Sequence, residues 1–437
     1  MKNNYQTRIL KKLANLQFAI GLLFTIGFLS AIGTIIEQNQ TLTFYKENYP
    51  ENNPLLGLIT WKVITFLNLD TVYTSWWFLT ILFLFVSSLL ACTLTTQLPS
   101  LKTFKLWKFI TKPKQFQRLV LKEKLNQKLN NVLAYTWNEN NYNIFRQGKK
   151  SYGYSGLLGR LAPVAVHGSI VLLLLGTTIG AFGGYVAQEI IPRGEVVHLQ
   201  NILNAGQFSY IPQEISCRIN DFWITYTEES KIDQFYSDVS LLDDKGLELK
   251  RKTIFVNEPL FYKGLTFYQT DWDLLGLKLN LNGNNQIQIP LKKIKKNGKN
   301  FWFASFDKLN KNQTKLSFVI NDLQGKVSIY DNKGALIQNV ELGQTFNQNG
   351  EELQITEVIS STGLQIKADP GLATVYFSFL FLMLSIYASF LTYSQIWVVQ
   401  NNGLLQLGGK SNRAVLYFQE EFRRNIKKTQ KQVNIRK

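Results

Sequence analysis

The stretch that decides the fold is LAPVAVHGSIVLLLLGTTIG, residues Leu161–Gly180, which contains one of only two histidines in a chain of 437 residues. No charged residue occurs between Arg160 and Glu189, so the run is long enough to cross a bilayer as a helix. An imidazole loses its hydration at such a position and needs a partner. His167 is therefore either hydrogen-bonded to a neighbouring helix or a ligand.

Three further apolar runs are long enough to span a bilayer. The first follows basic residues, as a signal peptide would, but it exceeds a usual signal core and lacks a clear small-x-small cleavage site. We therefore interpret it as a retained helix. The sequence predicts a multi-pass α-helical membrane protein with four transmembrane helices, at residues 16–36, 76–98, 161–185 and 372–399.

The distribution of charge predicts the orientation. The basic segments 1–15, 99–160 and 400–437 carry a summed formal charge of +22, which leaves −4 for the rest of a chain whose net charge is +18. Lysine and arginine concentrate on the side from which a membrane protein is inserted. Both termini and the loop 99–160 are therefore expected on that side, beside anionic lipid headgroups rather than nucleic acid. Residues 37–75, a short loop with an interfacial helix, and 186–371 are expected on the other side.

Residues 186–371 have the pattern of a β-rich domain between the third and fourth spans. The stretch LKLNLNGNNQIQIPL, residues 277–291, alternates apolar and polar positions on both sides of Asn282-Gly283, which predicts a hairpin. Short strands at this spacing favour an antiparallel sandwich or barrel-like sheet.

The sequence offers little for catalysis. It has no Gly-rich phosphate loop and no nucleophile elbow, and its two histidines are too few for a three-histidine metal site. Cys92 and Cys217 are predicted on opposite sides of the membrane, so they do not pair, and no C-x-x-C occurs. A membrane transporter or a receptor subunit is one interpretation of such a chain, although a transporter usually needs several intramembrane polar residues.

Five motifs, in this order, carry a family resemblance. They are GTIIEQ (33–38), FYKENYP (44–50), SWWF (75–78), LLACTLTTQLPSLK (89–102) and TGLQIKADPG (362–371). Together with the histidine of the third span, they resemble the ResB/CcsB family of System II cytochrome c biogenesis, and the length and the Lys/Asn/Ile-rich composition are most similar to a plastid-encoded member.

The resemblance implies a component of a holocytochrome c synthase complex rather than an enzyme alone. Such proteins work with CcsA to carry haem across the membrane and attach it to apocytochromes c, here cytochrome f and soluble c-type cytochromes. Attachment joins haem vinyl groups to the two thiols of a Cys-x-x-Cys-His site. The implied location is the plastid thylakoid membrane, with both termini stromal and the β-rich domain lumenal. A cyanobacterial thylakoid or plasma membrane is the second choice.

His167 is the expected ligand of the haem iron. It lies about 10 Å into the membrane at a helical rise of 1.5 Å per residue. Val171, Leu174 and Thr178 share its face of the helix, whereas Gly176, Gly180 and Gly184 lie mostly on the other side. The resemblance matches His167 to the essential transmembrane histidine of the family's haem site.

A single histidine supplies only one axial ligand, so the resemblance implies that the second comes from elsewhere, with CcsA as its source. His198 lies beyond the span and is expected to be a surface or core histidine. We expect no catalytic residue on this chain.

The charge distribution leads to a direct test of topology. A reporter fused after Lys437 is expected in the stroma or cytoplasm, and one inserted near Gly283 is expected in the lumen. Protease protection of the two reporters in sealed membranes measures this. Finding both on the same side would contradict four spans.

Overall fold

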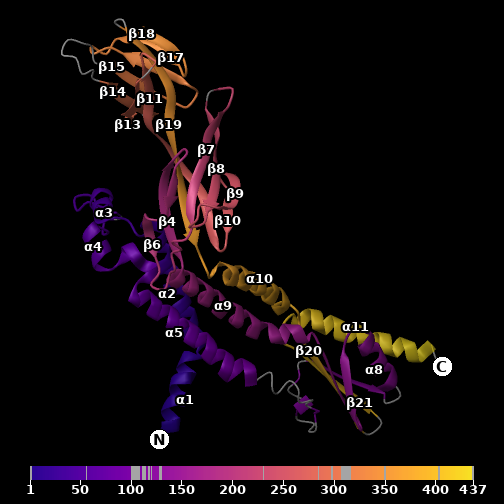
Figure 1. Ribbon diagram of the computed structural model, residues 1–437. Coiled ribbons are helices and arrows are strands. Elements are labelled where there is room, and N and C mark those ends of the chain that lie inside the picture. The colour runs from indigo at the N-terminus through magenta and orange to yellow at the C-terminus, as the bar shows by residue number, and fades with distance from the viewer. Residues whose placement is uncertain are drawn as a thin grey trace. The chain divides into compact units, whose positions relative to one another are not determined.

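A computed structural model describes most of the chain (Figure 1). The described residues are 2–55, 57–99, 109–110, 115–116, 119, 121–126, 130–229, 231–283, 285–296, 299–306, 316–348, 351–401 and 404–435. The chain divides into two compact units, residues 1–178 with 372–437, and residues 179–371.

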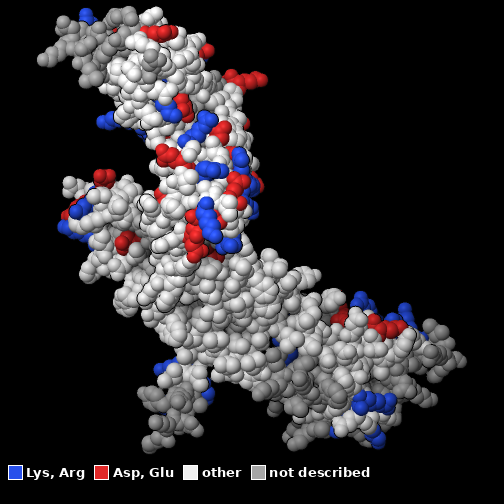
Figure 2. Space-filling view, in the orientation of Figure 1, with Lys and Arg blue, Asp and Glu red and all other residues white. Residues whose placement is uncertain are grey.

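Four helices are long and apolar enough to cross a membrane, as expected. Figure 2 shows that their visible surface carries almost no charged side chains. They are α2 (Leu16–Ile35), α5 (Trp76–Cys92) continued by the π-helical turn η2 (Thr93–Gln97), α9 (Leu157–Gly183) and α10 (Leu372–Ser389). A basic helix, α1 (Lys2–Leu13), precedes α2, and its last carbonyl accepts a hydrogen bond from Ser88 of α5 at 2.6 Å.

Small residues allow α9 and α10 to pack closely in antiparallel directions. A Cβ atom on Gly159 would lie 1.8 Å from the Leu391 carbonyl oxygen, and one on Gly176 would lie 3.0 Å from Val375. Buried Ser169 on α9 and Ser378 on α10 bond to carbonyls of their own helices. Such residues bring helix backbones together in membranes.

The predicted loop 99–160 and tail 400–437 are not separate segments. Strands from both form one antiparallel sheet in the order β1-β21-β20-β3-β2. Its strands are β1 (Leu121–Asn126), β2 (Asn143–Gln147), β3 (Lys150–Ser155), β20 (Ser394–Asn401) and β21 (Leu404–Ser411). The helices α8 (Asn130–Glu139) and α11 (Val415–Ile435) share its core, where Trp137 packs against Phe422 at 5.5 Å. Because β3 pairs with β20, these parts of the chain lie on the same side of any membrane.

The predicted end of the fourth span at residue 399 is wrong. The helix α10 stops at Ser389, and β20 begins at Ser394. The strand is apolar over Ile396–Val399 because both faces of its sheet are covered. A strand buried on both faces gives a continuous apolar run, which resembles the end of a helix in sequence.

The segment 37–75, predicted as a short loop with an interfacial helix, folds into several short helices. It contains α3 (Leu42–Asn48), α4 (Trp61–Phe66) and the 3-10 helix η1 (Leu69–Thr74). The GTIIEQ motif closes it, since Gln38 donates to the carbonyls of Ile36 and Leu69 and accepts from the Val72 amide. Tyr49 donates to the Glu37 carboxylate, which lowers the pKa of Glu37.

The second unit is β-rich and antiparallel throughout, as predicted. A seven-stranded sheet has the order β10-β11-β19-β4-β6, with β12 on β11 and β18 on β19; a four-stranded sheet has the order β5-β7-β8-β9 and a five-stranded one β13 to β17. The strands are β4 (Tyr185–Pro192), β5 (Val196–His198), β6 (Ile202–Ala205), β7 (Ser216–Tyr226), β8 (Ile232–Leu242), β9 (Glu248–Phe255), β10 (Leu260–Tyr262), β11 (Leu265–Leu281), β12 (Asn285–Pro290), β13 (Lys292–Lys296), β14 (Lys299–Phe306), β15 (Leu316–Ile320), β16 (Lys326–Tyr330), β17 (Leu336–Glu341), β18 (Thr345–Gln348) and β19 (Glu351–Ala368).

Two long strands, β11 and β19, connect two hydrophobic cores within this unit. One core lies around Phe267 and Ile366, the other around Leu277 and Ile355, and Trp272 packs against both. Three β-bulges interrupt the pairing of β11 with β19 and let the strands bend. The predicted hairpin between β11 and β12 is confirmed, with φ of 50° at Asn282 and 75° at Gly283.

The close approach of α9 and α10 predicts that Gly159→Ala destabilises the protein. The added methyl group would overlap the backbone oxygen of Leu391, just after α10, and overpacking of this kind costs about 1–3 kcal/mol. The matched control is Gly168→Ala on the same helix, where nothing lies within 4 Å. Thermal unfolding of the purified chain measures both. Equal melting temperatures for the two variants would disprove the close contact between Gly159 and Leu391.

Candidate functional site

His167 lies on α9 and is half-buried. Its Nδ1 atom is 3.1 Å from the Thr93 hydroxyl oxygen, and its Nε2 atom is 3.4 Å from the Gln97 amide nitrogen. Both neighbours belong to η2, at the end of the second span. The imidazole therefore bonds to a neighbouring helix, which is the first of the two readings that its sequence position allows.

These contacts fit a His167 tautomer that is protonated at Nδ1. The Thr93 hydroxyl donates to the Leu89 carbonyl at 2.8 Å, so its oxygen accepts from Nδ1–H. In this tautomer Nε2 is unprotonated and accepts from the Gln97 amide nitrogen that faces it. A histidine that donates through Nδ1 and keeps a lone pair on Nε2 has the form that metal-binding histidines adopt.

The π-helical turn makes this arrangement possible. The Leu98 amide donates to the Thr93 carbonyl, five residues earlier, so this turn is wider than an α-helical turn. Thr93 and Gln97 consequently present their side chains to the same imidazole. Single π-helical turns occur often at functional sites. Both residues belong to the motif LLACTLTTQLPSLK, but their contact with His167 requires the packing of α5 against α9 and was not expected from sequence.

On the face of α9 opposite His167, the glycines allow close packing, largely as their spacing predicts. Gly176 packs against Thr374 and Val375 of α10. Gly180 and Gly184 instead meet the Asp369 carboxylate and the Ala368 carbonyl, which precede α10. The glycine face and the histidine face of α9 therefore have different neighbours.

The other candidate residues are His198, Cys217 and Cys92. His198 is exposed on the edge strand β5. Cys217 is buried on β7, and burial raises the pKa of its thiol to about 12. Cys92 is the last residue of α5. In the described part of the chain, no group of three or more His, Cys, Asp or Glu side chains could hold a metal ion.

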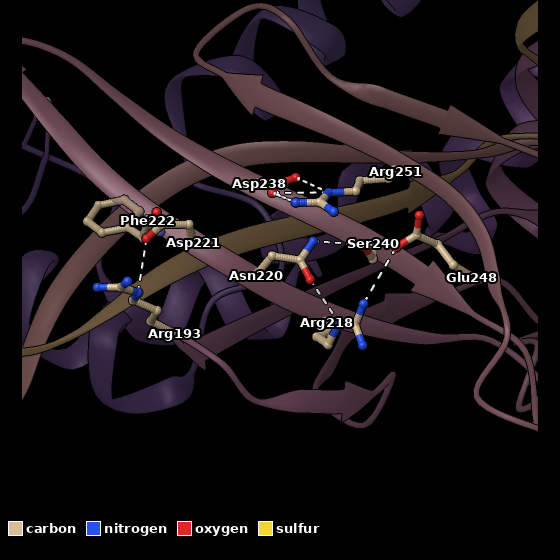
Figure 3. A network of polar contacts seen from close by, with 9 residues as sticks. All are labelled: Arg193, Arg218, Asn220, Asp221, Phe222, Asp238, Ser240, Glu248 and Arg251. Atoms are coloured by element: carbon tan, nitrogen blue, oxygen red, sulfur yellow. Dashed lines mark hydrogen bonds and ion pairs between the residues drawn. The ribbon is translucent and has the colours of Figure 1, made fainter.

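A network of ion pairs covers the outer face of β7, β8 and β9 (Figure 3). Arg251 pairs with Asp238, which lowers the pKa of that carboxyl, and Arg193 pairs with Asp221 at 2.9 Å. The other members, Arg218, Asn220, Ser240 and Glu248, bond to one another across the strands. The positive and negative charges of the network balance, so we interpret this face as a solvated structural surface.

Comparison with known proteins places the chain in a family. The ResB-like family matches residues 16–292 and 281–423. The chain belongs to the ResB-like family. A cytochrome c biogenesis protein Ccs1 from Emiliania huxleyi is 54% identical over 425 residues, covering 97% of this chain and 96% of that protein.

Two further relatives cover a similar extent. The Ccs1 protein of Pyropia yezoensis is 45% identical over 94% of both chains, and the cytochrome c biogenesis protein CcsB of a Nostoc species is 44% identical over 94% of this chain and 90% of its own. The ResB-like chain described here is thus a member of the Ccs1/CcsB group of cytochrome c biogenesis proteins, as the motif order indicated.

The burial of Cys217 predicts that both cysteines are dispensable. A thiol with a pKa of about 12 supplies almost no thiolate for redox chemistry at neutral pH. Cys217→Ser, Cys92→Ser and the double variant are expected to support normal c-type cytochrome levels, measured by haem staining at matched protein abundance. If Cys217→Ser alone abolished assembly at normal abundance, the thiol would have a redox role.

Proposed function

We propose that the chain acts at the step of haem delivery and covalent attachment to apocytochromes c, as one half of a synthase with CcsA. Family membership supports cytochrome c biogenesis, and the tautomer of His167 supports the haem step. The haem is the substrate of this complex, held for a time and then transferred, rather than a permanent cofactor.

The single observation that carries this proposal is the pairing of Thr93 with His167. By accepting from Nδ1–H, Thr93 fixes the ring and leaves the lone pair on Nε2, beside Gln97. An iron ion needs this lone pair. Gln97 occupies the position beside Nε2 at 3.4 Å, a long contact that binding of haem would replace.

The neighbouring side chains suit a flat, apolar substrate. Val171 and Leu174 follow His167 on the same face of α9 and are aliphatic and partly exposed. A single histidine provides one axial ligand. We therefore assign the second axial ligand to CcsA, and the attachment of haem to the cysteine thiols of the apocytochrome to the assembled complex.

The proposed location is the plastid thylakoid membrane, or the corresponding membrane of a cyanobacterium. Both termini would be stromal and the β-rich unit lumenal, in keeping with the charge distribution. The lumenal side is where c-type apocytochromes would meet the haem. No observation on the described residues favours the transporter or receptor alternative, and the absorbance spectrum of the purified chain with CcsA distinguishes them.

His167→Ala is expected to lower the haem content of the purified complex with CcsA by about tenfold or more and to abolish holocytochrome c formation. The protein should still insert and fold, because the contacts of Gly159 with Leu391 and of Gly176 with Val375 are untouched. Added imidazole should partly restore haem binding by filling the vacated position. The measurement is the haem spectrum at matched protein levels.

His198→Ala is the matched control and should leave the spectrum unchanged, since this side chain is exposed on β5. Thr93→Val removes the acceptor of Nδ1–H while keeping the side-chain volume, so it should weaken haem binding without removing the ligand. Normal haem content in His167→Ala would exclude ligation and leave this histidine with a structural role only.

A further inference from the structure

The second unit contains a cavity of about 790 Å³ that nothing above has used. It lies between the loop that follows β6, the β8–β9 turn, the β10–β11 turn and the end of β19. Its apolar lining includes Pro212, Ile215, Tyr262 and Leu265. The volume is within the range of sites that bind small ligands or peptide side chains.

Two aromatic side chains form the lip of this cavity. Phe208 is 75% exposed and Tyr210 is 72% exposed, which is unusual for large rings beside an apolar hollow. Phe208 is nevertheless held in place, because its amide donates to the Phe182 carbonyl at 2.8 Å and its ring lies 6.2 Å from the Phe182 ring. Exposed but fixed aromatic rings are typical of sites that bind a partner.

The charged groups that line the cavity are unbalanced. Four are carboxylates, Glu214, Asp243, Asp244 and Asp369, and one is the ammonium of Lys263. Asp369 has a cationic neighbour, Lys367, at 3.5 Å. The other three carboxylates have no salt bridge within the described residues, and Asp243 accepts only from the backbone amides of its own turn. The cavity therefore has a negative electrostatic potential around an apolar floor.

This chemistry selects the occupant. Anionic lipid headgroups and the propionates of haem would be repelled by the three unpaired carboxylates. A bare metal ion is also a poor match, since these carboxylates do not form a metal-holding group of three or more within the described residues. A flexible polypeptide with Lys or Arg on either side of an apolar side chain matches both features. The cations would pair with the carboxylates and stack on Phe208 or Tyr210, and the apolar group would enter the hollow.

We propose that this cavity binds a basic, unfolded segment of a client polypeptide. The proposal rests on the proposed function only in taking an apocytochrome as that client. It assigns to the β-rich unit the task of holding the polypeptide while haem is handled elsewhere on the complex. The carboxylates supply attraction and the cavity supplies an anchor, so the site would accept clients of varied sequence.

The test uses the purified full chain in detergent and a short peptide labelled with a neutral dye, in which lysines flank a single phenylalanine. We expect the peptide to bind, with an affinity that falls as salt is added. A peptide with glutamates in place of the lysines should not bind. The combined variant Glu214→Gln, Asp243→Asn and Asp244→Asn should weaken binding by about tenfold or more. Fluorescence anisotropy measures all four.

The matched control removes three exposed carboxylates of the same unit that do not line the cavity, with Glu228→Gln, Glu341→Gln and Glu352→Gln. This variant should bind the peptide as the unaltered chain does. Phe208→Ala, at a side chain too exposed to affect folding, should weaken binding without changing its salt dependence.

Three results would overturn the proposal: equal binding of the basic and acidic peptides, equal binding by the two triple variants, or a membrane contact at the lip. The last is measured with Phe208→Trp in nanodiscs, where quenching by brominated lipid would show that the bilayer covers the cavity. None of these measurements uses haem or CcsA. The proposed function is judged separately, by c-type cytochrome levels in cells that lack the chain.

Discussion

Direct contact between the backbones of α9 and α10 is the constraint on which most of the first unit depends. With no side chain at Gly159, the carbonyl of Leu391, just after α10, reaches the surface of α9. With none at Gly156, just before α9, the Thr392 carbonyl comes equally close to the chain there. The ends of the two helices are thereby held together, and β3 and β20, which adjoin them in sequence, begin already aligned for pairing. The chain leaves the five-stranded sheet of the first unit, the small sheet β1-β21-β20-β3-β2, through α9 and returns to it through α10.

The same contact leaves the other face of α9 free for a different neighbour. The π-helical turn at the end of α5 meets this face and provides a hydroxyl and an amide for His167. An imidazole in an apolar run needs such partners to offset its lost hydration. The two readings of His167, an interhelical bond and a ligand, are therefore compatible, because the bond to Thr93 occupies Nδ1 and defines the state of Nε2.

Sequence alone was sufficient for features that depend on local pattern. The four spans follow from the length of their apolar runs, and the hairpin at Asn282-Gly283 follows from the backbone conformation that these residues favour. Features that depend on distant contacts were missed. Trp137 and Phe422 lie 285 positions apart in the chain and share one core, and no local pattern reveals such a pairing. The partners of His167 were missed for the same reason, since they come from another helix.

The position of β19 in the chain has a consequence for biogenesis. This strand, residues Glu351–Ala368, lies between β11 and β4 and contributes to both cores of the second unit, so neither core is complete until it has been synthesised. The small sheet of the first unit likewise waits for β20 and β21 to join the hairpin of β2 and β3. Both units are thus closed by strands from the last part of the chain, through contacts of long sequence separation that form slowly. During synthesis, unpaired strand edges of the β-rich unit would be exposed for an extended time, and a nascent chain in this state is the form most prone to aggregation and most dependent on chaperones.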